Sequence, residues 1–305
     1  MKNARYVIAD VFTERQFGGN QLAVFIDGRG LDSRTMQDLA REMNFSETTF
    51  LLPPEQGGDY RVRIFTPATE LPFAGHPIVG TAFVIFADRL KPGNRDSISI
   101  TLETVVGLLP VDVSLGDGRS GHATMTQPIP KVIGGFDDLE RLAKALSLES
   151  SDIASTGLPV EAINNGIAVL IVPVGSLAAV EKIKIDSGAI ASIAREAGVV
   201  TVMAFTTETV QSESTAHCRV YAPGAGVGED PATGSANGPL GFYMVRHGLV
   251  EPAPINRIIS EQGFEMNRPS ILHIEVASDP ETRDVRGVRV GGGVVLSGRG
   301  EIILS

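Results

Sequence analysis

The chain has 305 residues, of which 43% are hydrophobic and 20% are charged, and its formal net charge is −10. This composition is typical of a folded globular protein, and the length is sufficient for two domains. The acidic balance and the lack of any run rich in Lys or Arg argue against a nucleic-acid-binding surface. No apolar run approaches the ~18 residues of a membrane-spanning helix, so no membrane partner is expected.

The single cysteine, Cys218, excludes a disulfide within the chain and a catalytic pair of cysteines. The first residues contain no apolar core of a secretory signal, so a cytoplasmic enzyme is expected. The sequence has no phosphate-binding P-loop. Gly291 to Gly293 lie between short predicted strands and indicate a turn or bulge, not a dinucleotide-binding fingerprint.

The first half of the chain is predicted to contain strands and two helices. Strands are expected at residues 6–10, 21–26, 45–52, 60–65, 97–102 and 107–113. An amphipathic helix is expected after Asp32 or Ser33, because apolar residues recur at positions 36, 39, 40 and 43. A second helix is expected from Pro77 onward, and it is apolar nearly all round, as in helices enclosed within a domain.

The second half follows a similar order after a crossover at residues 124–131. Helices are expected at residues 138–146 and 186–197, and strands at 167–173, 199–205, 219–223, 271–276, 285–290, 294–296 and 301–304. The predicted fold class is α+β, with two pseudo-symmetric domains at residues 1–125 and 126–305. Each is expected to wrap a barrel-like sheet around a central helix, and the last strands are candidates to complete the first barrel.

Two segments of the chain align with each other at about half its length. His76 aligns with Asp230, Pro77 with Pro231, Gly80 with Gly234, Thr81 with Ser235 and Ala82 with Ala236, an offset of 230 − 76 = 154 residues. The repeat predicts the same helix start in each half, with the prolines at the first helical position. Asp230 would then cap its helix, whereas His76 is a poorer cap.

The two predicted helix starts indicate a ligand as well as a fold. Free backbone N–H groups and the helix dipole favour an anion, such as a carboxylate, at each start. Gly80 and Gly234, expected three residues into each helix, would permit close approach of a facing helix or a ligand. The alternative is that both segments are only well-capped helix starts. His in one copy and Asp in the other favours divided chemistry over duplicated packing.

Glu47 is the third candidate for chemistry. It lies in a predicted strand, on the same face as the apolar side chains of Phe45 and Leu51. A carboxylate there lies at a barrel mouth or is costly to bury, and desolvation would make it a proton shuttle near neutral pH. The alternative is a solvated glutamate on an edge strand. The remaining histidines have no metal-ligand spacing and are predicted to be exposed or satisfied; they are His122, His217, His247 and His273.

Several stretches together resemble the PhzF family of phenazine biosynthesis, within the diaminopimelate-epimerase-like fold. They are residues 10–12, 19–25, 41–50, 63–67, 70–77, 229–236 and 300–304. The likeness covers nearly the whole chain in the same order. It is closer to the isomerase that names the family than to the thiol-dependent epimerases, because neither predicted helix start carries a cysteine. The resemblance implies two α+β barrels with an active site between them, usually in a homodimer.

The resemblance also implies roles for individual residues. Glu47 falls on the family's catalytic glutamate, and the assisting residues fall on His76, Asp230 and Ser235. The candidate substrate-binding residues are Asn20, Gly75, Thr81, Gly234 and Ala236. The naming isomerase moves a proton between ring carbons of trans-2,3-dihydro-3-hydroxyanthranilate without a cofactor, so a small carboxylic acid is the expected substrate and no cofactor or metal is expected.

Other functions are open at this point. An epimerase or racemase of an amino or hydroxy acid needs bases on opposite faces of one carbon, and Glu47 with Asp230 could supply them. A non-catalytic protein that binds small carboxylates at the helix starts is a further alternative. Pro231 stands where the phenazine isomerase has alanine, and this difference bears on the substrate more than on the chemistry.

Overall fold

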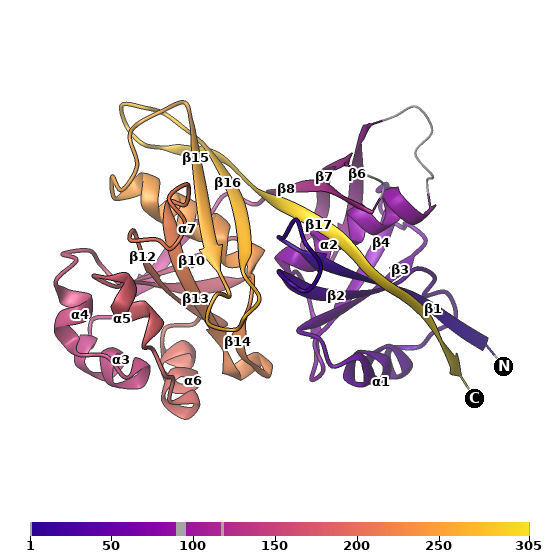
Figure 1. The fold of residues 1–305 in the computed structure, drawn as a ribbon, viewed down its shortest axis with the longest axis horizontal. Helices are drawn as coiled ribbons and strands as arrows, with labels where there is room; N and C mark the ends of the chain where they lie inside the picture. The colour runs from indigo at the N-terminus through magenta and orange to yellow at the C-terminus, as the bar shows by residue number, and fades with distance from the viewer. Residues whose placement is uncertain (1, 90–95, 117–118, 305) are drawn as a thin grey trace. The chain divides into compact units, whose positions relative to one another are not determined.

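A computed structural model describes residues 2–89, 96–116 and 119–304, and the fold is mixed α+β and rich in strands (Figure 1). The chain forms two compact units. Unit 1 comprises Met1–Thr126 and Gly291–Ser305, and unit 2 comprises Gln127–Val290. In the part of the chain that the structure describes, no helix has the length and apolar character needed to cross a bilayer.

Unit 1 is a barrel of strands with one helix inside it and one outside. Its elements are β1 (Lys2–Val11), β2 (Asn20–Phe25), α1 (Ser33–Met43), β3 (Glu47–Leu52), β4 (Tyr60–Phe65), β5 (Glu70–Leu71), α2 (Gly75–Val84), the π-helical turn Ile85–Arg89, β6 (Ser97–Thr104), β7 (Gly107–Leu115), β8 (Ser120–Gln127) and most of β17 (Val285–Leu304).

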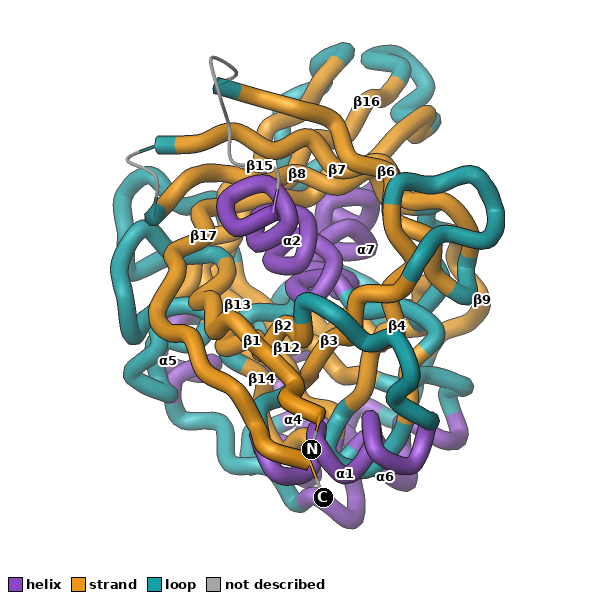
Figure 2. The backbone as a smooth tube through the Cα atoms, turned by 90° about the vertical axis from the view of Figure 1, so that its right-hand side faces the viewer, coloured by secondary structure: helices purple, strands orange, loops and turns teal. Residues whose placement is uncertain are grey.

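Eight strands of unit 1, among the described residues, form a closed ring in the order β17, β1, β2, β3, β4, β6, β7, β8. Pairing of β8 with β17 closes the ring. The pairs β2–β3 and β4–β6 are parallel. Figure 2 looks toward α2, around which the labelled strands of this ring are arranged.

Helix α2 fills the ring because every one of its ten residues is buried. At Gly80 the helix packs closely against the strands of the barrel wall. A Cβ atom there would be 2.6 Å from Val11 Cγ2 and 2.7 Å from Leu22 Cδ2, so a glycine is needed for this packing. The close approach predicted at Gly80 is therefore to strand side chains, not to a facing helix or a ligand.

Helix α1 covers the outside of the barrel, as its spacing of apolar residues predicts. Asp32 is the N-cap and accepts a hydrogen bond from the Thr35 N–H, and Asn44 ends the helix in the left-handed conformation. The buried face packs on an aromatic cluster in which the rings of Phe25 and Phe50 stack with centroids 4.8 Å apart.

Unit 2 contains the remaining elements. They are β9 (Lys131–Gly135), α3 (Leu139–Leu146), α4 (Ser150–Ala154), β10 (Glu161–Asn164), β11 (Ala168–Pro173), α5 (Leu177–Glu181), α6 (Ser187–Glu196), β12 (Thr201–Thr206), β13 (Ala216–Ala222), the 3₁₀ turn Pro223–Ala225, β14 (Val227–Asp230), α7 (Gly234–Arg246), β15 (Ile255–Gln262), β16 (Ser270–Ser278) and the start of β17.

The sheet of unit 2 lies between α7 and a layer of four short helices. Its strand order is β9, β10, β11, β12, β13, β15, β16, with β14 also paired to β13. Helix α7 contacts β11, β15 and β16, and helices α3 to α6 contribute to one buried apolar cluster with β10, β11 and β12. All residues of β11 are buried, as expected for a strand covered on both faces.

Several predicted boundaries are wrong. Of the turn or bulge predicted at Gly291 to Gly293, the turn is wrong, because these residues lie inside the single strand β17. Glycine is required there for close packing, because a Cβ on Gly291 would be 2.2 Å from Thr124 Oγ1 and one on Gly293 would be 2.5 Å from the Thr13 carbonyl oxygen. Strand β15 is absent from the sequence prediction, and the strand predicted at residues 45–52 begins only at Glu47.

The two central helices do not start at the aligned residues of the repeat. Helix α2 begins at Gly75 after Ala74, so Pro77 is its third residue and Gly80 its sixth. Helix α7 begins at Gly234 after Thr233. The starts are therefore 234 − 75 = 159 residues apart and not 154.

Asp230 and Pro231 consequently lie before α7. Asp230 is the last residue of β14, so it is not the N-cap of the helix, and Pro231 is not its first residue. Gly234, which was expected three residues into the helix, is its first residue. The sequence repeat marks the same region of each half but not the same helical positions.

Candidate active site

In unit 1, strand β3 and helix α2 bring Glu47 and His76 together. Glu47 is the first residue of β3, and its Oε2 lies 3.4 Å from Nε2 of His76. The two side chains are 13% and 3% exposed. Glu47 shares a strand face with Thr49, whose hydroxyl is 2.8 Å from that of Thr81 on α2, so this face points into the barrel.

Asn20 holds the other side of the His76 ring. Its Nδ2 lies 3.0 Å from Nδ1 of His76. Which group donates in this contact depends on the tautomer of the ring, and Nε2 is the ring nitrogen that faces Glu47.

Burial keeps the His76 ring neutral. Desolvation lowers its pKa to about 3, against the opposing effect of a hydrogen bond with the Gln21 backbone. A neutral N–H near a carboxylate stabilises the negative charge less than an imidazolium would. The His76 ring that lies beside the Glu47 carboxylate is therefore a neutral imidazole and not an imidazolium.

In unit 2, a short segment between β14 and α7 carries Asp230. Its carboxylate Oδ2 accepts a hydrogen bond of 2.6 Å from the Thr233 hydroxyl, and the Asp230 backbone carbonyl accepts one of 2.6 Å from Gln262 Nε2. Asp230, Thr233 and Ser235 are all buried, with 8%, 8% and 7% exposure. The segment is therefore fixed from the end of β15.

Each central helix presents two backbone N–H groups at its start. In α2 these belong to Gly75 and His76, since Pro77 has none, and in α7 they belong to Gly234 and Ser235. Within the described residues, none of these four groups bonds a backbone acceptor outside its own helix. An anionic group is the natural ligand of such helix starts.

The first turn of α7 is supported by side chains from elsewhere in unit 2. Pro239 lies inside the helix and has no N–H to donate to the carbonyl of Ser235. Asn165 replaces that donor, with its Nδ2 2.9 Å from the Ser235 oxygen, and also bonds Oε1 of Gln127 at 2.8 Å. Gln127 in turn donates to the Gly234 carbonyl at 2.9 Å.

The predicted site residues thus form two groups, each within one unit. The structure brings Glu47, His76 and Asn20 into contact around Gly75, and it places Asp230, Ser235, Gly234 and Ala236 in one short segment. Thr81 is fully buried and its hydroxyl contacts Thr49. The part of each residue in binding or catalysis stays a prediction.

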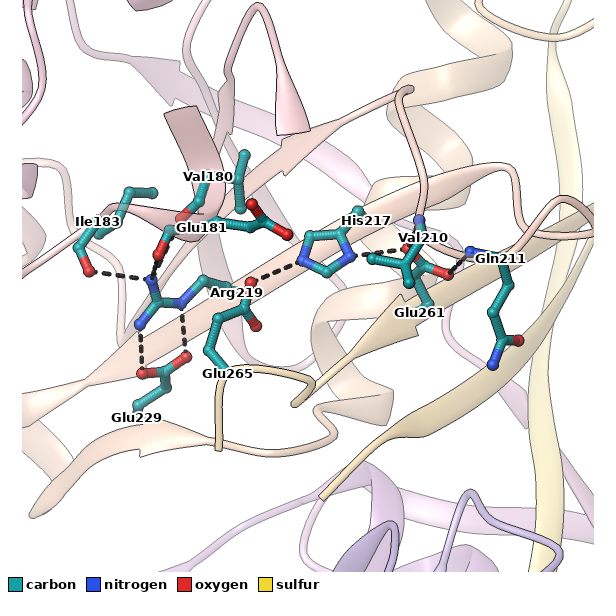
Figure 3. Close-up of polar contacts among 10 residues, drawn as sticks. All are labelled: Val180, Glu181, Ile183, Val210, Gln211, His217, Arg219, Glu229, Glu261 and Glu265. Atoms are coloured by element: carbon teal, nitrogen blue, oxygen red, sulfur yellow. Dashed lines mark hydrogen bonds and ion pairs between the residues drawn. The ribbon is translucent and has the colours of Figure 1, made fainter. Parts of the chain in front are cut away.

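A separate buried cluster in unit 2 involves His217, which the sequence predicts to be satisfied. Its Nδ1 lies 2.8 Å from Glu261 and its Nε2 2.9 Å from Glu265 (Figure 3). Burial by itself lowers the pKa of His217, but hydrogen bonds to the two carboxylates outweigh it and raise the pKa to about 9. The ring is therefore a cation paired with one buried and one half-buried acid, which confirms the prediction that His217 is satisfied.

Arg219 and Cys218, on the same strand, also have structural roles. Arg219 forms a two-pronged ion pair with Glu229 at 2.8 Å and donates to the carbonyls of Val180, Glu181 and Ile183 (Figure 3). Cys218 is fully buried, and burial raises the pKa of its thiol to about 12. A thiol in this state is a packing group and not a nucleophile.

Sequence reasoning missed Thr233, Gln262, Asn165 and Gln127. Thr233 carried a signal, because its counterpart in the repeat, 233 − 154 = 79, is the apolar Val79. Where one copy of a repeat has a polar residue and the other an apolar one, the polar side chain is expected to make a hydrogen bond that the other copy lacks. Gln262 and Asn165 carried none, since their hydrogen bonds reach segments 29 to 70 residues away.

Comparison with known proteins agrees with this fold. The family model described as "Phenazine biosynthesis-like protein" matches residues 9–300. A trans-2,3-dihydro-3-hydroxyanthranilate isomerase from Pseudomonas chlororaphis is 38% identical, over 98% of this chain and 99% of the relative.

Two solved structures extend the likeness to three dimensions. A phenazine biosynthesis protein of the PhzF family from Bacillus anthracis superposes with a TM-score of 0.87 at 29% identity, covering 100% of both chains. A predicted epimerase from Pseudomonas aeruginosa gives a TM-score of 0.83 at 32% identity, covering 99% of this chain and 100% of the other. The chain therefore belongs to the phenazine biosynthesis-like (PhzF) family, and it is an isomerase.

Proposed function

We propose that this isomerase moves a proton between carbon atoms of a small carboxylic acid without a cofactor, with Glu47 as the proton shuttle. The observation that carries the proposal is the contact between the Glu47 carboxylate and a neutral, buried His76. The relatives named as isomerases of trans-2,3-dihydro-3-hydroxyanthranilate make that compound the first substrate to test.

In the proposed reaction, the Glu47 carboxylate removes a proton from a substrate carbon and the C–H electron pair enters the conjugated system. The resulting negative charge extends toward the substrate carboxylate, and helix-start N–H groups such as those of Gly75 and His76 suit its stabilisation. Protonated Glu47 then returns the proton to a different carbon, so the bond count and the charge are both restored.

Asp230 and Ser235 have assisting roles in this proposal. A carboxylate and a hydroxyl suit hydrogen bonds to the amino or hydroxyl groups of the substrate, which would orient it for transfer at one carbon. His76, whose Nε2 lies 3.4 Å from the shuttle carboxylate, would orient polar groups of the substrate together with Asp230, and both residues are candidates for proton relay.

Incubation of the dihydro-hydroxyanthranilate with the chain in heavy water, followed by NMR, tests the proposal. The wild-type chain should form an isomer with deuterium at the reprotonated carbon. Glu47→Gln should lower the rate by roughly 10²- to 10⁴-fold, the usual contribution of a general acid–base group. It should leave binding of a substrate analogue, measured by calorimetry, nearly unchanged.

Glu42→Gln is the matched control, because Glu42 is an exposed glutamate on α1. Isomerisation at an undiminished rate by Glu47→Gln would remove Glu47 from the shuttle role. The stereochemistry of the product separates the alternatives: inversion at one carbon without a double-bond shift indicates an epimerase, and binding without turnover indicates a carboxylate-binding protein.

A further inference from the structure

Thr233 uses its side chain for Asp230 and not for the helix that it precedes. It is the N-cap of α7, where a threonine hydroxyl ordinarily accepts a hydrogen bond from the first turn. No such side-chain bond is present, and the Ala236 N–H bonds the Thr233 carbonyl instead. The hydroxyl donates to Asp230 Oδ2 at 2.6 Å. The Thr233 hydroxyl thus bonds a predicted site residue, and it does not cap the first turn of α7.

Gln262 determines the direction of that hydroxyl. Its side chain is fully buried at the end of β15, and its Nε2 donates to Thr233 Oγ1 at 3.1 Å and to the Asp230 carbonyl at 2.6 Å. A hydroxyl that accepts from an amide has its one proton free for another partner, here the carboxylate. The amide, the hydroxyl and the carboxylate therefore form a directed chain of hydrogen bonds.

The carbonyl oxygen of the Gln262 amide also bonds Thr233. Oε1 accepts from the Thr233 N–H at 3.1 Å, so both the backbone and the side chain of Thr233 are held by one amide. Two further contacts hold the same segment. Ser270 Oγ, at the start of β16, donates to the Pro231 carbonyl at 2.9 Å. Gly263, directly after β15, packs so closely that a Cβ there would be 2.5 Å from the same carbonyl oxygen.

We propose that Thr233 and Gln262 are positioning residues of the isomerase reaction, which hold the Asp230 carboxylate in one orientation toward the substrate. The inference rests on the function proposed for Asp230. Neither residue is required to touch the substrate, because each acts through the aspartate. Their loss should therefore slow turnover while leaving the affinity for the substrate nearly intact.

The test uses steady-state kinetics of the full chain with the dihydro-hydroxyanthranilate. Thr233→Val preserves the shape of the side chain and removes its donor, and it should lower kcat by about 10-fold or more with KM changed by less than about 3-fold. Thr233→Ser restores the hydroxyl and should recover most of the rate. Gln262→Glu, which replaces the donating Nε2 with an oxygen, should show a defect like that of Thr233→Val.

A double-mutant cycle separates positioning from a general loss of packing. Residues that act through Asp230 are non-additive with it, so Thr233→Val should cause no further loss in an Asp230→Asn background. Thr206→Val is the matched control, because Thr206 is a buried threonine of unit 2 whose hydroxyl accepts a turn N–H from Glu208 at 3.3 Å and is not bonded to Asp230. It should retain the wild-type kcat. A full multiplicative loss in the Asp230→Asn background would overturn the inference.

Crystal structures of the wild-type chain and of Thr233→Val supply a readout that does not depend on activity. The Asp230 carboxylate should rotate or become disordered in the variant, and an unchanged carboxylate would overturn the inference. If the wild-type chain leaves the compound unaltered, the proposed function fails for this substrate. The orientation of Asp230 in the two structures then still decides whether Thr233 positions it.

Discussion

The proline inside α7 makes the side chain of Asn165 a substitute for a backbone hydrogen bond. Asn165 is 2% exposed and donates to the Ser235 carbonyl at 2.9 Å. Asn165→Leu leaves this buried acceptor without a donor, at a cost of about 1–3 kcal/mol in the free energy of unfolding. Pro239→Ala supplies a backbone N–H at position 239, four residues after Ser235, so the helix can bond that carbonyl itself.

The two changes should therefore be coupled. In the Pro239→Ala background, Asn165→Leu should cost about 1–2 kcal/mol less than in the wild-type chain, because the carbonyl keeps a donor. Asn165→Leu also removes the contact with Gln127 and the buried Asn165 Oδ1, which has no hydrogen-bond partner in the described residues. Both effects occur in both backgrounds, so their free energies cancel in the comparison. The cycle thus isolates the single bond to Ser235.

Urea denaturation of the four chains, followed by circular dichroism, measures the coupling. Asn164→Leu serves as the control. Asn164 Oδ1 accepts from the Gly166 N–H at 2.7 Å and not from α7, so this substitution should have the same cost in both backgrounds. If Asn165→Leu has equal cost with and without Pro239, to within about 0.5 kcal/mol, Asn165 is not the replacement donor.

Three further outcomes follow from the geometry. Asn20→Asp places a carboxylate beside Nδ1 of His76 and should raise the pKa of the ring above its wild-type value of about 3; ¹⁵N chemical shifts across a pH titration report this, and an unchanged pKa would contradict it. His217 has a folded-state pKa of about 9, above its ordinary 6.5, so its contribution to stability is complete below the lower value and is lost as pH rises through the upper one. The free energy of unfolding should fall across that window by at most ~1.4 kcal/mol per pH unit, and His217→Gln should flatten the slope. Gly80→Ala should destabilise the chain by about 1–3 kcal/mol through overcrowding, whereas Gly188→Ala, where the added carbon would be 3.4 Å from its nearest neighbour, should be neutral or stabilising by up to about 1 kcal/mol; thermal unfolding compares the two.

The elements that local signals determine could be predicted from the sequence. The capping aspartates Asp32, Asp138 and Asp186 each begin a predicted helix and each accepts the expected backbone N–H. The apolar surface of α2 likewise indicated its place inside a barrel. These predictions succeed because the energetic cause lies within one turn of the residue concerned.

The first residues of the central helices, and the residues that hold the site residues in place, could not be predicted in the same way. A proline is tolerated throughout the first turn of a helix, where the N–H groups have no intrahelical partner, so Pro77 marks the turn but not its first residue. The glycines at 291 and 293 have the composition of a turn, and only contacts with distant chain segments explain their place in a strand. Gln262 is positioned by strand pairing with Cys218 and Ser270, which no local pattern encodes.

Strand β17 has a consequence for how the chain emerges from the ribosome. The barrel of unit 1 needs the pairing of residues 294–304 with β1, from Lys2↔Leu304 to Val11↔Val294. Its first seven strands are therefore synthesised early but must wait, with a gap in the wall, until all of unit 2 has been made. Unit 2 is continuous in sequence and can fold as soon as it emerges, whereas the barrel around α2 depends on contacts of the longest sequence separation. Closing this barrel therefore has to follow the synthesis of residues 127–290, although every other strand of its wall precedes them in the sequence.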